Sequence, residues 1–182
     1  MSAIDGLKRF YWEALHELRA YRSHLLWHIP GRVGVAIRLR HFRSHIQSCG
    51  DDVAVMLNVR VLSGDRLRIG SRVTVDRDCY LNASGGIDIG DDCYVGPDTK
   101  IWTDNHVFSD PALPFIDQGA TYKPVSIERD VWIGPRCFIK PGSTVKTGAV
   151  LMPGTVLAKS VPPFAIVQGN PGLIVGWRRP RG

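Results

Sequence analysis

Aliphatic residues recur at every sixth position along most of this chain. From Ile69 the sequence divides into the blocks "IGSRVT", "VDRDCY" and "LNASGG", and after a two-residue slip it continues as "IGDDCY", "VGPDTK" and "IWTDNH". The blocks resume at Ile127 as "IERDVW" and run to "LAKSVP", and all 12 blocks begin with Ile, Leu or Val. A half-exposed strand repeats every second residue, and a helix every 3.6 residues. A period of six instead predicts a solenoid, in which short strands form stacked coils.

Two further columns of residues support stacked coils. The fifth residue of a block is mostly small or β-branched, and the second residue is often Gly. In a solenoid, like side chains lie above like, so that each coil buries the apolar row of its neighbour. We therefore expect a mainly β fold in which residues 49–165 form a parallel solenoid. The fifth-position residues are Val73, Cys79, Cys93, Thr99, Val131, Cys137, Ser143, Ala149, Thr155 and Val161, and the glycines are Gly70, Gly90, Gly96 and Gly134.

Three of the four cysteines, Cys79, Cys93 and Cys137, occupy this inward column. A buried thiol packs as a small apolar group. The chain contains no C-x-x-C pair of the kind that marks metal and redox sites. We therefore interpret these cysteines as packing residues rather than metal ligands, nucleophiles or disulfide partners.

The six-residue rhythm stops near the middle of the chain, around a single histidine. His106 ends the block "IWTDNH", whereas the other five histidines lie within the first 48 residues. Residues 104–126 hold turn formers together with Phe108, Phe115 and Tyr122, which makes them too apolar for a slack linker. We expect one protruding loop here that packs against a neighbouring subunit. Because imidazole titrates near neutral pH, His106 could act as a general base, or it could make a structural hydrogen bond within the loop.

The two ends of the chain differ from the repeats. Residues 1–48 hold eight Lys or Arg and three Asp or Glu, which gives +5 of the net charge of +6. Hydrophobic spacing predicts a basic helical arm there, with helices over residues 5–29 and 32–46. In the second helix we expect the arginines, Arg38 among them, to lie largely away from the apolar face. Residues 166–182 are expected to form a C-terminal tail.

The basic arm leaves two uses open. Basic amphipathic segments with an aromatic anchor can lie on an anionic membrane surface. Alternatively, the arm caps the open end of the solenoid, as repeat proteins require. The first residues lack the apolar core of a signal peptide, and no apolar run is long enough to span a bilayer. We therefore expect a cytoplasmic protein, with peripheral contact at the inner membrane surface through residues 1–48 as the open alternative, and no nucleic acid as partner.

Taken together, several motifs resemble the hexapeptide-repeat acyltransferases. They are the repeats, the histidine-bearing loop, "PVSIERDVWIGPRCFIKPGSTV" and "VPPFAIVQGNP", and they cover roughly residues 50–178. That family includes sugar O-acetyltransferases and xenobiotic acetyltransferases. The resemblance implies a left-handed parallel β-helix that forms a homotrimer with its active sites between subunits. It also implies acetyl-CoA or another acyl-CoA as donor, a sugar or other small molecule as acceptor, and no metal.

The same resemblance assigns roles to individual residues. His106 matches the general base, and Asn82, Asp104 and Asn105 are candidates for binding the acceptor. The 20 residues from Leu81 to Ile101 also predict that Asn82 lies under Trp102. Asn82 could equally hold a solenoid turn, and the group that orients His106 is open between Asp104, Asp110 and a backbone carbonyl. The candidates for binding CoA are Trp132, Gly134, Gly154, Thr155, Lys159 and Arg178.

The sequence departs from the family pattern at two places. The residue after "WIG" is Pro135, which has no N–H to donate, and Gly172 and Leu173 follow "NP" where relatives usually place Ala and a basic residue. Arg178 or Arg179 is therefore our candidate for the phosphate contact. His106 and Asp110 also form H-x-x-x-D, a signature of the chloramphenicol-type acyltransferases. Those enzymes have a non-repetitive fold, so the match carries little weight.

Several alternatives remain beside an O-acetyltransferase of polysaccharide or glycolipid synthesis. The acceptor could be an antibiotic hydroxyl or an amino sugar. A catalytically silent scaffold subunit would keep the repeats but could lose the loop histidine and "VWIG", and this chain has both. A zinc enzyme on the same fold needs three converging histidines, whereas the repeat region has one.

Overall fold

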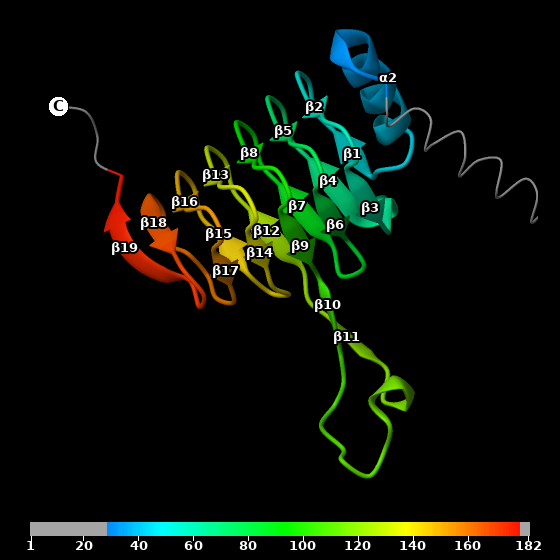
Figure 1. The fold of residues 1–182 in the computed structure, drawn as a ribbon, viewed down its shortest axis with the longest axis vertical. Helices are drawn as coiled ribbons and strands as arrows, with labels where there is room; N and C mark the ends of the chain where they lie inside the picture. The colour runs from blue at the N-terminus through cyan, green and yellow to red at the C-terminus, as the bar shows by residue number, and fades with distance from the viewer. Residues whose placement is uncertain (1–28, 179–182) are drawn as a thin grey trace, which may run out of the picture.

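The computed structural model describes residues 29–178, and these form a three-sided parallel β-solenoid with one helix at its N-terminal end (Figure 1). The predicted mainly β class is confirmed. Apart from Ile29, the predicted helix over residues 5–29 lies outside the described residues. The second predicted helix is present as α2 (Gly31–Arg43).

Each side of the solenoid is one sheet, to which every coil contributes a short strand. Face A contains β1 (Ser48–Cys49), β4 (Leu67–Ile69), β7 (Ile87–Ile89), β12 (Val125–Ile127) and β15 (Thr144–Val145). Face B contains β2 (Ala54–Val55), β5 (Thr74–Val75), β8 (Tyr94–Val95), β13 (Trp132–Ile133), β16 (Val150–Leu151), β18 (Ala165–Gln168) and β19 (Leu173–Trp177). Face C contains β3 (Arg60–Leu62), β6 (Tyr80–Asn82), β9 (Lys100–Trp102), β14 (Phe138–Ile139) and β17 (Val156–Leu157). The chain passes from A to B to C, so the solenoid has an A–B, a B–C and a C–A corner.

The six-residue columns form the core of the solenoid. None of the 12 leading aliphatic residues is more than 3% exposed, and every small or β-branched residue of the fifth column is buried. Except for β18 and β19, neighbouring strands on the three faces pair in parallel, with Leu81 beside Ile101 and Ile101 beside Ile139. The period in the sequence is therefore the length of one strand and its turn.

The C-terminal segment departs from the expected separate tail, because residues 165–177 complete face B. Strand β18 pairs in parallel with β16, and β19 then folds back antiparallel on β18. An antiparallel strand that closes the solenoid has no partner above it. The side chains of Leu173, Ile174, Val175 and Trp177 are consequently exposed.

Helix α2 also departs from its sequence pattern at one residue. Arg38 is only 2% exposed, although we expected it away from the apolar face. Its Nε donates a hydrogen bond to the carbonyl of Val55 (3.1 Å), and a terminal nitrogen donates to the carbonyl of Ile29 (2.7 Å). The guanidinium therefore fastens the helix to strand β2 while Phe42 packs into the core.

Coil stacking leaves no room for a side chain at some corners. A Cβ atom on Gly96 would lie 2.7 Å from the carbonyl carbon of Gly134 and from the carbonyl oxygen of Ile133 in the next coil. At Gly176, in the closing strand, the nearest atom would be 3.9 Å away.

We predict that Gly96→Ala lowers the melting temperature, at a cost of about 1–3 kcal/mol for overpacking. The control Gly176→Ala should melt near the wild type, and equal melting of the two variants by circular dichroism would contradict this packing.

The cysteines of the inward column are buried and free, as we expected. Burial raises the pKa of Cys79 to about 12 and that of Cys93 to about 11. Burial also raises the pKa of Cys137, whereas Cys49 is partly exposed.

We predict that Cys49 alone reacts quickly with an aromatic disulfide reagent at pH 8, and that all four thiols react after denaturation. The pKa of these buried thiols is higher in the folded protein than the value of 9.0 expected in the unfolded chain. Above pH 9 the unfolded chain therefore loses thiol protons first, so the free energy of unfolding should fall as the pH rises further. Mass spectrometry of labelled peptides distinguishes the sites. Rapid labelling of Cys79 in the native protein would contradict the packed core.

Candidate functional site

The protruding loop leaves the solenoid at the C–A corner and extends well away from it (Figure 1). Its base is an antiparallel ribbon of β10 (Asp104–His106) and β11 (Ala120–Tyr122), and a short 3-10 turn covers Phe115–Asp117. Thr103 is fully buried just before the ribbon, and its hydroxyl donates a hydrogen bond to the carbonyl of Asn82 (2.6 Å). A buried polar residue thus fixes the point at which the chain leaves the coil.

Asn82 connects the solenoid to the loop. Its backbone lies beside Trp102, as the spacing predicted, and the residue is only 1% exposed. The side-chain oxygen accepts a hydrogen bond from the N–H of Ser84 (3.1 Å), while the side-chain nitrogen donates to Asp104 Oδ1 (2.8 Å). Asn82 therefore holds a turn and also fixes Asp104, which lies two residues before His106 on the same strand.

His106 stands at the end of β10 with its side chain exposed. Its ring meets Phe115 edge to face, with the ring centres 5.7 Å apart. Within residues 29–178 the imidazole nitrogens form no hydrogen bond, and the two predicted orienting carboxylates bond to other groups. Asp104 accepts from Asn82, and Asp110 accepts from the N–H of Ala112. Both imidazole nitrogens are thus accessible to a substrate.

Trp132 lies on face B rather than at the corner that bears His106. It pairs with Tyr94 of the coil below and Val150 of the coil above, and its side chain is 39% exposed. The hydroxyl of Tyr94 donates to Asp76 Oδ2 (2.5 Å), and this contact raises the pKa of Tyr94 to about 12. Tyr94 and Trp132 of paired strands thus leave two aromatic side chains partly exposed on the flat face.

A groove of about 820 Å³ runs along the B–C corner across successive coils. Pro97, Pro135 and Pro153 line it, and Gly154 leaves open space above the corner, because a Cβ there would meet no atom within 4 Å. The exposed guanidinium groups of Arg77 and Arg136 flank the prolines, together with Asp78 and Asp98. Sequence reasoning missed both arginines, which lie two coils apart at adjacent turn positions: Arg77 is the third residue of its block and Arg136 is the fourth.

The backbone N–H groups of Gly134 and Gly154, and the hydroxyl of Thr155, are not available to CoA. The N–H of Gly134 donates to the carbonyl of Leu151 (2.7 Å), and that of Gly154 donates to Pro135 (2.9 Å). Thr155 is fully buried, and its hydroxyl donates to the carbonyl of Met152 (2.6 Å). Coil stacking consumes these donors, so only the open surface of Gly154 is available to a ligand.

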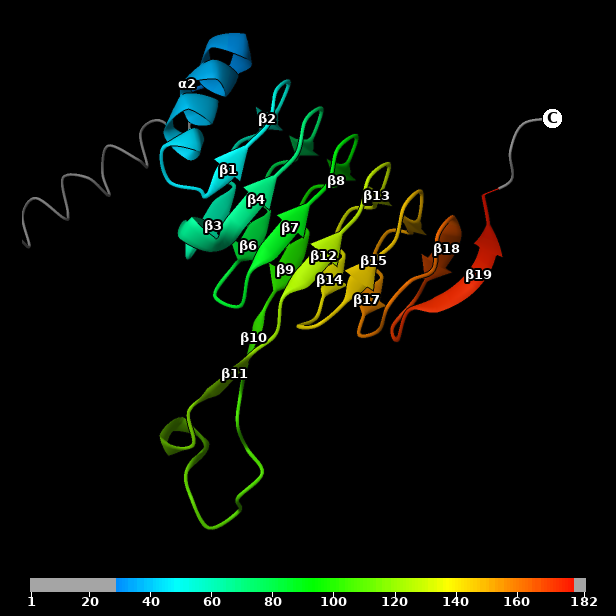
Figure 2. The same cartoon turned by 180° about the vertical axis from the view of Figure 1, so that it is seen from behind.

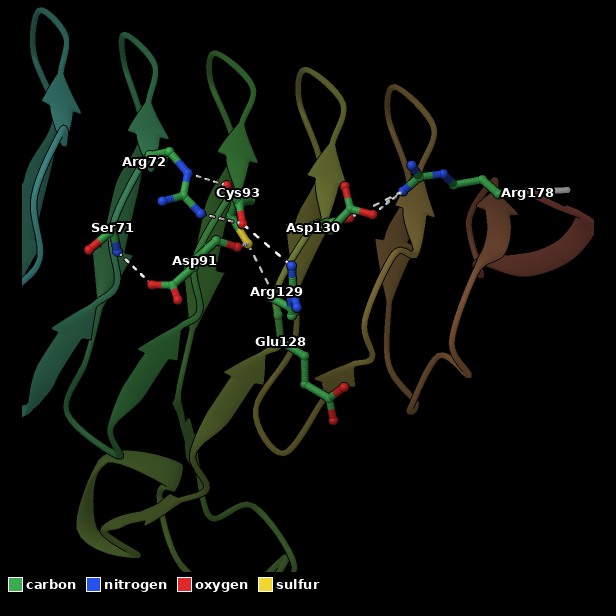
Figure 3. A network of polar contacts seen from close by, with 9 residues as sticks. Ser71, Arg72, Asp91, Cys93, Glu128, Arg129, Asp130 and Arg178 are labelled. Carbon is green, nitrogen blue, oxygen red and sulfur yellow. Dashed lines mark hydrogen bonds and ion pairs between the residues drawn. The ribbon is translucent and has the colours of Figure 1, made fainter. Parts of the chain in front are cut away.

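The structure places Arg178 and Lys159 at corners other than the groove. A terminal nitrogen of Arg178 donates to Asp130 Oδ2 (3.0 Å) and to the carbonyl of Gly148 (2.9 Å) at the A–B corner (Figure 3). This guanidinium is therefore engaged in closing the solenoid rather than directed at the groove. Lys159 follows β17 at the C–A corner, where it is exposed.

Predicted site residues are therefore distributed over the molecule. The C–A corner brings together Asn82, Asp104, Asn105 and His106. The groove lies at the B–C corner, and Trp132 lies on face B, between the A–B and B–C corners. One protomer does not unite these groups. Within the described part of the chain, no three His, Cys, Asp or Glu side chains gather as metal ligands.

The chain is similar in sequence and in fold to known acetyltransferases. A probable acetyltransferase of Mycobacterium tuberculosis is 34% identical over 113 residues, which are 62% of this chain and 38% of that protein. A hexapeptide-repeat acetyltransferase of Vibrio cholerae, also solved with acetyl-CoA, superposes with a TM-score of 0.78 at 28% identity over 91% of each chain. A maltose O-acetyltransferase of Clostridium difficile gives a TM-score of 0.80 at 27% identity, over 92% of this chain and 90% of that one. A scan against models of known protein families finds no match.

These comparisons confirm the resemblance that the motifs suggested. The fold is the left-handed β-helix of the hexapeptide-repeat acetyltransferases. The chain has acetyltransferase homologues, although it spans less than half the length of the Mycobacterium tuberculosis relative.

Proposed function

We propose that this protein transfers an acetyl group from acetyl-CoA to a hydroxyl group of a sugar, with His106 as general base. The observation that carries the proposal is an exposed imidazole without a hydrogen-bond partner in the described chain, held on a strand that Asn82 and Asp104 anchor to the solenoid. The fold supports it, because the Vibrio cholerae neighbour has been solved with acetyl-CoA and the Clostridium difficile neighbour is a maltose O-acetyltransferase.

His106 would act through neutral imidazole. A ring nitrogen accepts the proton of the acceptor hydroxyl while that oxygen attacks the thioester carbonyl carbon. The resulting oxyanion collapses, the C–S bond breaks, and the imidazolium returns its proton to the leaving CoA sulfur. The products are an acetyl ester and free CoA, and the imidazole is regenerated. An edge-on contact with Phe115 limits the rotation of the ring without occupying either nitrogen.

The acceptor would lie against the strand that carries His106. Asp104 is half-buried and Asn105 is exposed, so both can offer hydrogen bonds to sugar hydroxyls. Asn82 is too deeply buried to contact a sugar, so its role would be to hold Asp104. A sugar hydroxyl of polysaccharide or glycolipid synthesis is our first choice of acceptor, followed by an antibiotic hydroxyl and an amino sugar.

The donor would occupy the groove at the B–C corner. Its proline walls and the uncovered Gly154 suit the thin, largely apolar pantetheine arm, and Arg77 and Arg136 suit the phosphates. Trp132 would flank the arm on face B. Lys159 lies on a different corner, so it could reach the same donor only from a second subunit.

A homotrimer would unite the two halves of the site. The loop exposes Phe108 (74%), Ile116 (72%) and Phe115 (59%), and such an apolar surface favours contact with another subunit. A loop that reaches the neighbouring solenoid would bring His106 to that subunit's groove. The flat aromatic surface of Tyr94 and Trp132 would then lie within the interface.

We predict that His106→Ala lowers acetyl transfer to an accepted sugar by about 10² to 10⁴, the usual contribution of a general base. His45→Ala is the matched control, because His45 is exposed beyond the end of α2 and should leave the rate unchanged. Release of CoA thiol measures the rate. A His106→Ala rate within a few-fold of the wild type would refute the assignment.

We predict that two inactive variants restore activity when they assemble together. Gly154→Phe should block the groove without unfolding the coil, because Arg136 adopts a positive φ (58°) at the equivalent turn position. In a trimer refolded from equal amounts of His106→Ala and Gly154→Phe chains, about one quarter of the shared sites keep both wild-type halves. Light scattering should show a trimer and CoA release about one quarter of wild-type activity. A monomeric active enzyme, or no recovery in mixed trimers, would rule out sites between subunits.

A further inference from the structure

Helix α2 lies at the N-terminal end of the solenoid (Figure 2), and all of its charged side chains are positive. Residues 29–48 contain four arginines and no Asp or Glu. Of these, Arg32 and Arg40 are exposed and form no ion pair within the described chain, and Val33 between them is 68% exposed. Elsewhere in the solenoid, exposed arginines mostly pair with carboxylates, as Arg68 does with Asp88 and Arg72 with Asp92. Arg60 and Arg77 are also exposed without an ion pair, but α2 carries two such arginines and no acidic residue of its own.

The helix is held in a fixed position on the solenoid. Arg38 donates to the carbonyls of Val55 and Ile29, so its side chain ties α2 to strand β2. Burial lowers its pKa, and no carboxylate of the described residues pairs with it. Because this arginine anchors the inner side of the helix, Arg32 and Arg40 are displayed together on the outer side.

An apolar groove of about 790 Å³ opens beside the same helix. Val35, Ala36 and Leu39 of α2 form one wall, and Met56 and Leu57 of the first coils form the other. The buried guanidinium of Arg38 and the exposed one of Arg32 also line it, with Asp52, Asp76 and Arg77 toward the solenoid. Apolar walls and cationic groups therefore share one surface.

We propose that α2 and its groove form a docking surface for the anionic face of a phospholipid bilayer. Lipid phosphates would contact Arg32 and Arg40, while Val33 and the groove would receive apolar acyl segments. Nucleic acid or an acidic protein could satisfy the arginines, but neither offers acyl chains to the adjoining groove. The contact would be peripheral, since none of the described helices is long and apolar enough to cross a membrane.

The orientation of the surface is compatible with catalysis. The loop that bears His106 leaves the middle coils, while α2 caps the N-terminal end, so a bilayer at α2 leaves the loop exposed (Figures 1 and 2). Membrane docking would bring the enzyme close to an acceptor carried on a lipid. Docking does not require acetyl transfer, so each can fail alone.

Flotation of the full chain with vesicles tests the proposal. Vesicles of phosphatidylcholine with phosphatidylglycerol should bind the protein in a salt-sensitive manner, and vesicles of phosphatidylcholine alone should not. Each arginine near an anionic surface contributes about fivefold to partitioning, so Arg32→Gln with Arg40→Gln should lower it by about 30-fold. Val33→Ser, at a side chain that already faces water, should lower it by a few-fold.

Matched controls separate docking from net charge and from catalysis. Arg129→Gln with Lys140→Gln removes the same charge from exposed corners of the solenoid and should float like the wild type. His106→Ala should also float normally. Equal loss in both double variants, or undiminished binding by the α2 variant, would overturn the proposal. Tighter binding to duplex DNA than to anionic vesicles at the same salt concentration would identify a nucleic-acid surface instead.

Discussion

The stacking of each coil directly on the next is the constraint on which the rest of the molecule depends. The N–H of Gly70 donates to the carbonyl of Ile89, and that of Gly90 donates to Ile127, each at 2.8 Å. This ladder continues along all three faces, so the backbone N–H groups of each coil bond to carbonyl oxygens of the next coil. It also requires an aliphatic or small residue at each inward position and excludes a side chain at corners such as Gly96. A surface built in this way is regular, flat and poor in free backbone donors.

Chemistry must therefore come from side chains and from places where the stacking is interrupted. The loop after Thr103 is one such interruption, and buried polar groups define where it begins. Thr103 bonds to the carbonyl of Asn82, and the Asn82 side chain bonds to Asp104. Since an unpaired polar group in such a core is costly, each of these bonds holds the others in place. The exposed His106 thus stands two residues from a rigid attachment even though most of the loop extends into solvent.

The sequence accurately predicted the parts of the fold that follow the six-residue repeat. A period of six measures the distance between equivalent points in the solenoid, so it predicted the buried columns, the packed cysteines and the position of Asn82 beside Trp102. It could not show which corner a residue outside the repeats would reach. Arg178 follows an antiparallel strand that ends the repeat, and its guanidinium closes the A–B corner. The period also does not reveal that the N–H groups of Gly134 and Gly154 are already bonded.

Helical periodicity failed at Arg38 for a different reason. The spacing of residues indicates which side of a helix faces the solenoid, but it does not show that carbonyl oxygens at the boundary need donors. The carbonyls of Ile29 and Val55 lie where the helix meets strand β2, and one long guanidinium satisfies both. A hydrophobic side chain there would leave those oxygens without these bonds. The same requirement explains how a helix rich in arginine can dock on an apolar core: one arginine is used for attachment, and the others remain in solvent, where their charge can act on a partner.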